Sequence, residues 1–272
     1  MGDAKRKSRK AEDILAGEAR CIYCSGPAET LEHMPPVGMF RARQRPGAME
    51  FAACEACNNG TRGADAVAAV MARLHPDDGE GTWQAGEIRK LIPALDARAP
   101  GVREEMSRSG KAVYEWIPRS GSGLLQKVVR AHADGPLVKG YLTAFGAKLG
   151  MALYREHVGT PLPLDGAVWC QFALSGGMTQ KVLDARVQIL PGYETLRQGT
   201  KHVSDQFAYR FNTDERTVVA AVAQYHKGLW FTLFASSDPR IVELFVKPEF
   251  LALPASAMVR PGGVLALLPA LS

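Results

Sequence analysis

Four cysteines form two identical short-spaced pairs, and this arrangement favours a metal site. The pairs are Cys21-x-x-Cys24 and Cys54-x-x-Cys57, and 29 residues separate them. Two pairs at this spacing can bring four thiolates together around one tetrahedral zinc ion. We therefore predict a structural zinc site formed by these four residues, with two unrelated redox-type pairs as the alternative. The fifth cysteine, Cys170, stands alone in the sequence.

Residue types suited to catalysis occur in a distinct order around these pairs. The sequence EHMPP occupies residues 32–36, between the pairs, and NNG occupies residues 58–60, directly after the second pair. Each segment alone is compatible with a bland structural role: a loop histidine, a surface acid, a proline turn or a left-handed helix cap. Their combination, between and after two metal-binding pairs, favours a catalytic site.

The segments CIYC, TLEHMPP and CEACNNG resemble the zinc-bound form of the HNH endonucleases, whose core is a ββα-metal finger. The resemblance covers about residues 18–75. In that family a β-hairpin presents an acid-His pair, a helix presents a His or Asn, and the acid and the helix residue hold one divalent ion. The resemblance therefore implies His33 as a catalytic residue and Glu32 and Asn58 as ligands of the divalent ion, with Asn59 as an alternative ligand.

These residue types fit the hydrolysis of a phosphodiester bond. The reaction needs a nucleophilic water, a cation that neutralises charge on the phosphorus oxygens, and stabilisation of the departing oxygen. Neutral His33 can take a proton from water at physiological pH, so we expect it to be the general base. Carboxylate and amide oxygens suit Mg²⁺ or Mn²⁺. Successive side chains of a strand point to opposite faces, so Glu32 can hold the ion while His33 faces water.

Two features depart from the pattern of the family. Its middle Asn, which orients the base, has no counterpart between Met34 and Cys57, so we expect another group, such as a backbone carbonyl, to orient His33. The Lys or Arg that often follows the helix residue is represented by Arg62, four positions after Asn58. We expect Arg62 to clamp a phosphate.

Basic residues also suggest the partner. Arg41, Arg43 and Arg45 lie in the loop between the EHMPP segment and the second cysteine pair. We expect Arg41 and Arg43 to contact a nucleic-acid backbone, with an ordinary solvated loop as the alternative. The formal net charge of +5 is compatible with a polyanionic partner without requiring one. We therefore predict a nucleic-acid partner and favour DNA.

The elements that must position these residues divide into a small module and a larger domain. We predict a basic N-terminal tether at residues 1–17, a nuclease module at 18–75 that contains a helix from 65 to 74, and a domain at 83–272 that serves specificity or regulation. The expected fold class is α+β. It comprises a zinc-stapled ββα-metal module, followed by a larger helical and antiparallel-sheet domain.

The pattern of the larger domain changes from helical to alternating along the chain. A helix is predicted from 136 to 157, where Gly140, Gly146 and Gly150 indicate close contact with another element. Downstream, alternating apolar residues predict a hairpin turn at 226–228 and strands at 168–173, 185–190, 207–211, 218–225 and 229–234.

Composition excludes several classes of protein. The 272 residues are 46% hydrophobic and 22% charged, unlike a disordered or fibrous chain. No window reaches the roughly 18 uninterrupted apolar residues of a membrane span, and the basic start of the chain lacks the apolar segment of a secretory signal. We therefore expect no membrane partner and a cytoplasmic location.

Two other functions compete with the nuclease hypothesis. One is a non-catalytic zinc module that uses the same four cysteines to bind nucleic acid or protein. The other assigns the main role to residues 83–272, as an interaction or ligand-sensing domain. Cleavage of nucleic acid that depends on His33 would separate the nuclease from both.

Overall fold

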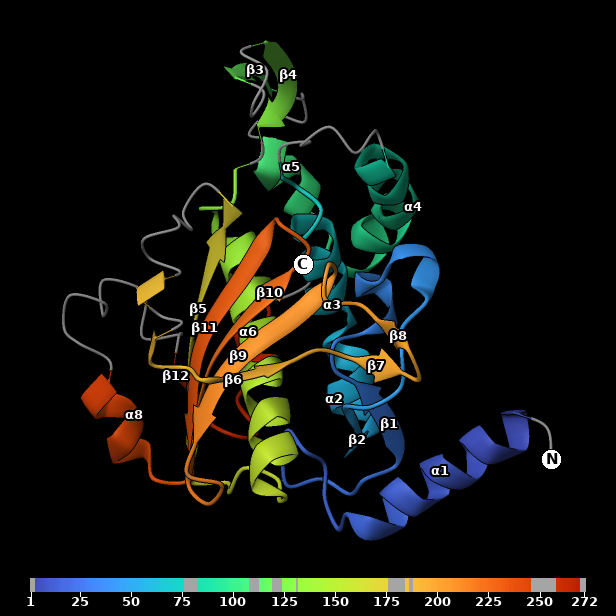
Figure 1. Cartoon of the computed structure of the whole chain (residues 1–272), viewed down its shortest axis with the longest axis vertical. Helices are drawn as coiled ribbons and strands as arrows, with labels where there is room; N and C mark the ends of the chain where they lie inside the picture. The colour runs from blue at the N-terminus through green and yellow to red at the C-terminus, as the bar shows by residue number, and fades with distance from the viewer. Residues whose placement is uncertain are drawn as a thin grey trace.

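Helices and antiparallel sheets make up the protein, as the predicted α+β class requires. The structure is a computed structural model that describes residues 3–75, 83–107, 113–118, 124–130, 132–175, 184–185, 188–245 and 258–269. A small two-stranded sheet lies in the N-terminal part and a six-stranded sheet in the larger part (Figure 1). None of the helices among these residues is both long and apolar enough to cross a membrane.

The N-terminal elements follow the order β-β-α. Helix α1 (Asp3–Gly17) leads to the first cysteine pair, and strand β1 (Thr30–His33) pairs antiparallel with β2 (Glu50–Ala53). The connection between these strands contains the short helices η1 (Val37–Met39) and η2 (Arg41–Arg43). Helices α2 (Glu55–Gly60) and α3 (Arg62–Met71) follow, so the predicted helix at 65–74 is confirmed but begins at Arg62.

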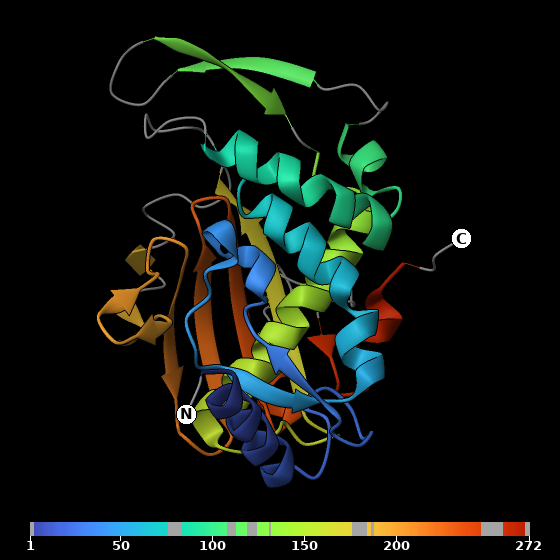
Figure 2. The same ribbon diagram turned by 90° about the vertical axis from the view of Figure 1, so that its right-hand side faces the viewer.

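Along the chain, several elements lie between these N-terminal elements and the strands of the large sheet. They are α4 (Trp83–Arg98), α5 (Val102–Ser107), the hairpin β3 (Val113–Pro118) and β4 (Leu125–Arg130), and the long helix α6 (Pro136–Val158). The hairpin lies at one end of the molecule in both views, while α6 lies near its centre (Figures 1 and 2). Helix α6 confirms the prediction for 136–157.

The large sheet has the strand order β12-β5-β11-β10-β9-β6. Its strands are β5 (Ala167–Leu174), β6 (Gly192–Glu194), β9 (Phe207–Thr213), β10 (Val218–Tyr225), β11 (Leu229–Ser236) and β12 (Met258–Val259). Beside it lie the small pair β7 (Arg197–Gln198) and β8 (Lys201–His202), helix α8 (Pro239–Phe245) and η6 (Leu265–Leu267). Four predicted strands are confirmed, and Tyr225 pairs with Leu229 across the predicted turn.

The predicted strand at 185–190 is wrong. Among the residues described there, Asp184, Ala185 and Gln188 are helical, and Leu190 has no regular structure. Strand β6 forms the edge of the sheet instead, and Ile189 is 62% exposed. An alternating pattern forms a strand when its apolar side chains make up one buried face of a sheet. The apolar residues described in this segment do not form such a face.

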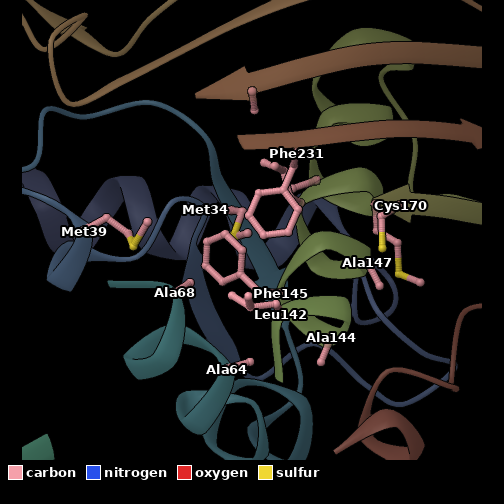
Figure 3. Packing of buried hydrophobic residues seen from close by; sticks show 14 of the residues in the cluster. Met34, Met39, Ala64, Ala68, Leu142, Ala144, Phe145, Ala147, Cys170 and Phe231 are labelled. Carbon is pink, nitrogen blue, oxygen red and sulfur yellow. The ribbon is translucent and has the colours of Figure 1, made fainter. Parts of the chain in front are cut away.

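One apolar core joins the N-terminal elements to the large sheet. Helix α6 packs against β5 on one side and α3 on the other. A Cβ added to Gly146 would lie 2.9 Å from Cys170 Sγ, which confirms the predicted close contact. Figure 3 shows Met34 beside Phe145 of α6 and Phe231 of the sheet, all in the same buried cluster. The predicted boundary at 75–83 therefore separates two parts of one core.

Candidate metal sites and catalytic pocket

The four cysteines of the two pairs converge on one point. The Sγ atoms of Cys21, Cys24, Cys54 and Cys57 all lie within 4.8 Å of one another. Cys24 Sγ is 3.6 Å from the Sγ atoms of both Cys54 and Cys57. A tetrahedral ion with Zn–S bonds of about 2.3 Å needs sulfurs about 3.8 Å apart. This cysteine cluster can therefore hold a structural metal ion such as zinc.

Local backbone geometry prepares the cysteine cluster for a metal ion. The N–H of Tyr23 donates to Cys21 Sγ, and the N–H of Cys57 donates to Cys54 Sγ, each at 3.3 Å. Cys54 is also the N-cap of α2. The hydrogen bond between Cys57 and Cys21 lowers the pKa of Cys21 and raises the pKa of Cys57, while burial raises the pKa of Cys24. The thiolate, which is the form that binds metal, is therefore favoured at Cys21.

The β1-β2 hairpin and α2 are tied together by the side chain of Asn58. Its Nδ2 donates to Thr30 Oγ1 and to the backbone oxygen of Leu31, both at 3.0 Å. These bonds hold α2 against β1, next to Glu32. Asn58 of α2 therefore lies against β1, the strand that carries Glu32.

One pocket of about 350 Å³ collects five of the six residues predicted for catalysis or nucleic-acid binding. Glu32, His33 and Asn58 all line it, together with Arg43 and Arg62. These side chains come from β1, from α2, from the connection between the strands and from the start of α3. The fold therefore brings five residues that were proposed from sequence to a single cavity.

Two further charged residues of the pocket, Asp65 and Arg98, were missed by sequence reasoning. Asp65 lies on α3 one turn after Arg62, so helical periodicity from Arg62 was a usable signal for it. Arg98 ends α4. No local pattern relates Arg98 to the N-terminal segments, because it reaches the pocket only through packing of α4 on α3.

The basic and the acidic residues of the pocket differ in their ion-pair partners. Arg43, Arg62 and Arg98 are exposed, and no described carboxylate lies within ion-pair range of any of them. The acidic residues of the pocket, Glu32 and Asp65, instead pair with a lysine that lies outside its wall. The pocket therefore offers three uncompensated arginines to a ligand, which suits an anion with several phosphate groups.

The carboxylate of Glu32 is buried behind the pocket. The residue is only 3% exposed, and burial raises the pKa of Glu32 to about 7, against the opposing effect of Lys148. Its Oε2 is buried and has no hydrogen-bond partner among the residues described. Lys148 Nζ lies 3.6 Å from this oxygen, at ion-pair distance, so Oε2 faces the lysine. The carboxylates of Glu32 and Asp65 both line the pocket, and carboxylate oxygens are hard ligands that suit Mg²⁺ or Mn²⁺.

His33 lies on the opposite face of β1 and is half-buried. The strand register pairs it with Glu50, and His33 Nε2 is 3.8 Å from Glu50 Oε1. Burial, reinforced by the charge of Arg45, lowers the pKa of His33. The neutral form that can accept a proton is therefore favoured near physiological pH. Glu50 is its acidic neighbour, and it is a candidate for the group, such as a backbone carbonyl, that was expected to orient His33 in place of the family's middle Asn.

The three arginines of the loop after β1 have different environments. Arg43 lines the pocket. Arg41 lies outside the described pocket, with its guanidinium 3.9 Å from the ring centroid of Trp83 and Nη1 3.4 Å from Asp205 Oδ2. Arg45 is buried and donates to five backbone oxygens of the loop, so it holds this loop in place. Of the three, Arg43 is best placed to reach a ligand in the pocket.

The cysteine cluster and the pocket are neighbours, because α2 carries both Cys57 of the cluster and Asn58 of the pocket. The first is suited to a structural metal ion, and the second combines a histidine, hard oxygen ligands and arginines without an ion-pair partner among the described carboxylates. Both arrangements must be interpreted from their chemistry, without a relative as a guide. Comparison of the chain with protein-family models, with curated proteins and with solved structures finds no match.

Proposed function

We propose that the protein is a metal-dependent endonuclease of the HNH type, which hydrolyses phosphodiester bonds in DNA. The observation that carries this proposal is the pocket in which Glu32, His33 and Asn58 lie together with arginines that have no acidic partner among the residues that the structure describes. A general base, hard oxygen ligands and a basic rim are the components that cleavage of a polyanionic backbone requires. The cysteine cluster beside the pocket supports the same proposal.

In the proposed mechanism His33 removes a proton from the attacking water. Its lowered pKa keeps it neutral beforehand, and the nearby Glu50 carboxylate stabilises the imidazolium that forms. Glu32 and Asn58 hold the divalent cation. When bound, Mg²⁺ or Mn²⁺ supplies positive charge for the phosphorus oxygens and the departing oxygen. Arg62 binds a neighbouring phosphate of the strand.

The structural metal in this proposal is zinc, held by the cysteine cluster. The first pair precedes β1, and the second pair joins β2 to α2. One ion bound by both pairs therefore fixes the helix that carries Asn58 relative to the strand that carries Glu32 and His33. Zinc thus has no part in the chemical step but preserves the geometry of the pocket.

The test is cleavage of plasmid DNA in the presence of Mg²⁺ or Mn²⁺, with wild type compared with His33→Ala. We expect His33→Ala to lose about 100-fold or more in rate, since general base catalysis contributes about that much. Zinc content and circular dichroism should stay unchanged. His202→Ala, which removes an exposed histidine outside the pocket, is the matched control.

Two results would overturn the proposal. Equal cleavage by wild type and purified His33→Ala would exclude His33 as the base. Absence of cleavage by wild type on DNA and RNA, together with retained zinc and retained binding of nucleic acid, would favour the non-catalytic zinc module.

A further inference from the structure

One lysine is completely enclosed behind the pocket. Lys148 has no exposed surface, and its Nζ lies 2.8 Å from Asp65 Oδ1 and 3.6 Å from Glu32 Oε2. It comes from the middle of α6, which packs between the large sheet and α3 (Figures 1 and 2). The larger region thus contributes a charged side chain to the two carboxylates of the pocket.

Stability alone gives no reason for a charge at this position. An ion taken out of water loses hydration, and a buried ion cluster is often no more stable than apolar side chains of similar volume. The charge of Lys148 is matched to the carboxylates of Glu32 and Asp65, which would lose their cation if an apolar residue replaced the lysine. The location of the charge, against two pocket residues, is therefore the better guide to its role.

The geometry also limits how Lys148 can act. Glu32 and Asp65 line the pocket, whereas Lys148 does not. A ligand in the pocket would therefore contact Glu32 and Asp65 but not Lys148, which acts on it through the position of these carboxylates and through the field of its charge. With all three side chains ionised, the cluster carries one net negative charge.

We infer that Lys148 is a positioning residue, which holds Glu32 and Asp65 from behind so that both serve as ligands of the divalent cation in the pocket. This inference rests on the proposed metal-dependent function and adds Asp65 to the ligand set of Glu32 and Asn58. It also explains why α6, outside the predicted nuclease module, must pack on α3 for the site to be complete. Groups that orient metal ligands typically contribute about 10- to 100-fold to metal affinity.

The test measures binding of Mn²⁺ directly, by electron paramagnetic resonance of the free ion, on the full-length zinc-loaded protein. We expect wild type to bind one Mn²⁺, and Lys148→Met and Asp65→Asn each to weaken binding at least tenfold. Lys139→Met, the same substitution earlier on the same helix, is the matched control and should bind like wild type. In cleavage assays Lys148→Met should lower kcat and leave the KM for DNA unchanged.

Folding is checked separately by zinc content and circular dichroism. If Lys148→Met fails to fold, the Mn²⁺ affinity of Asp65→Asn provides the test instead. Asp65→Asn leaves Glu32 paired with Lys148, so no buried carboxylate loses its cation. Wild-type Mn²⁺ affinity in Asp65→Asn, or in folded Lys148→Met, would overturn the inference, as would a wild type that binds no Mn²⁺. A wild type that binds Mn²⁺ through these residues but cleaves no nucleic acid would support the inference and refute the nuclease function.

Discussion

The cysteine cluster and the carboxylate–lysine cluster of Glu32, Asp65 and Lys148 both involve the N-terminal elements but are assembled differently. The cysteine cluster is made of two tight pairs on either side of one β-hairpin. The carboxylate–lysine cluster combines one residue each from β1, α3 and α6. The first can form once the hairpin closes, whereas the second forms only when α6 packs on α3. Damage to the two clusters should therefore have different consequences for the protein.

Loss of the cysteine cluster should have the largest effect. Cys57→Ser is expected to release the metal and unfold residues 18–75, because structural zinc contributes about 10–16 kcal/mol of binding free energy that is also folding free energy. Metal analysis and limited proteolysis measure both consequences. Cys170→Ser, a buried cysteine outside the cluster, is the control and should keep the metal. Full zinc content in Cys57→Ser would contradict the assignment.

Loss of the buried lysine should lower stability without loss of zinc. Lys148→Met is expected to reduce the free energy of unfolding by about 3–5 kcal/mol, because Glu32 and Asp65 remain buried without their cation. Adding Glu32→Gln and Asp65→Asn removes both charges and should restore most of the stability. Chemical denaturation of the single and triple variants checks this. A triple variant as unstable as the single one would show that packing, and not charge, causes the loss.

The contact between the large sheet and the loop after β1 predicts a pH dependence. His226, in the β10-β11 turn, is 2% exposed, and its Nε2 donates to Met39 O at 2.8 Å. Burial, and next the charge of Arg73, lowers the pKa of His226 to about 4. The unfolded chain, with a pKa near 6.5, then binds more protons, so the stability present above pH 6.5 is lost as the pH falls toward 4.

The size of this effect can be checked by denaturation at pH 7 and pH 5. We expect wild type to lose about 2 kcal/mol over this range through His226 alone. His226→Gln lacks the titrating group, so its loss should be smaller by that amount. The same pH dependence in both proteins would show that His226 does not link the two regions in this way.

Two neighbouring asparagines provide a finer comparison within α2. Asn58→Ala removes two hydrogen bonds to β1 and should cost about 1–2 kcal/mol. Asn59 is exposed and bonds only to Glu55 on its own helix, so Asn59→Ala should change stability by less than about 0.5 kcal/mol. Denaturation measures both, and Asn58→Ala should also raise the Mn²⁺ requirement. If Asn59→Ala raised the Mn²⁺ concentration needed for cleavage more than Asn58→Ala did, Asn59 would be identified as the ligand instead.

The smallest effect on stability is expected at the rim of the pocket. Arg98→Ala should change the free energy of unfolding by less than about 0.5 kcal/mol. If Arg98 binds one phosphate, the substitution should reduce the salt dependence of DNA binding by about one unit of slope. Arg41→Ala should leave the slope unchanged, since Arg41 stacks on Trp83 and pairs with Asp205. If Arg41→Ala reduced the slope and Arg98→Ala did not, the result would indicate that DNA contacts Arg41 and not Arg98.

The sequence by itself determined the features that depend on short-range spacing. The two cysteine pairs, helix α6 and strands β5, β9, β10 and β11 follow from patterns within a few residues, because knuckles, helices and strands are locally periodic. Helix α4 was not predicted, since Pro93 lies within it and only Gln84 and Leu95 are buried. The HNH function and the cytoplasmic location remain predictions.

Only the tertiary structure decided which charges meet. Lys148 lies in an apolar helix and Arg98 ends an unpredicted one, so nothing near either residue in sequence indicates a pocket. Arg98 reaches the pocket, and Lys148 reaches two of its carboxylates, because α4 and α6 pack on α3. The environment of a charge depends on every element packed around it, so the sequence could suggest Glu32 as a candidate ligand but could not show the buried lysine that pairs with it.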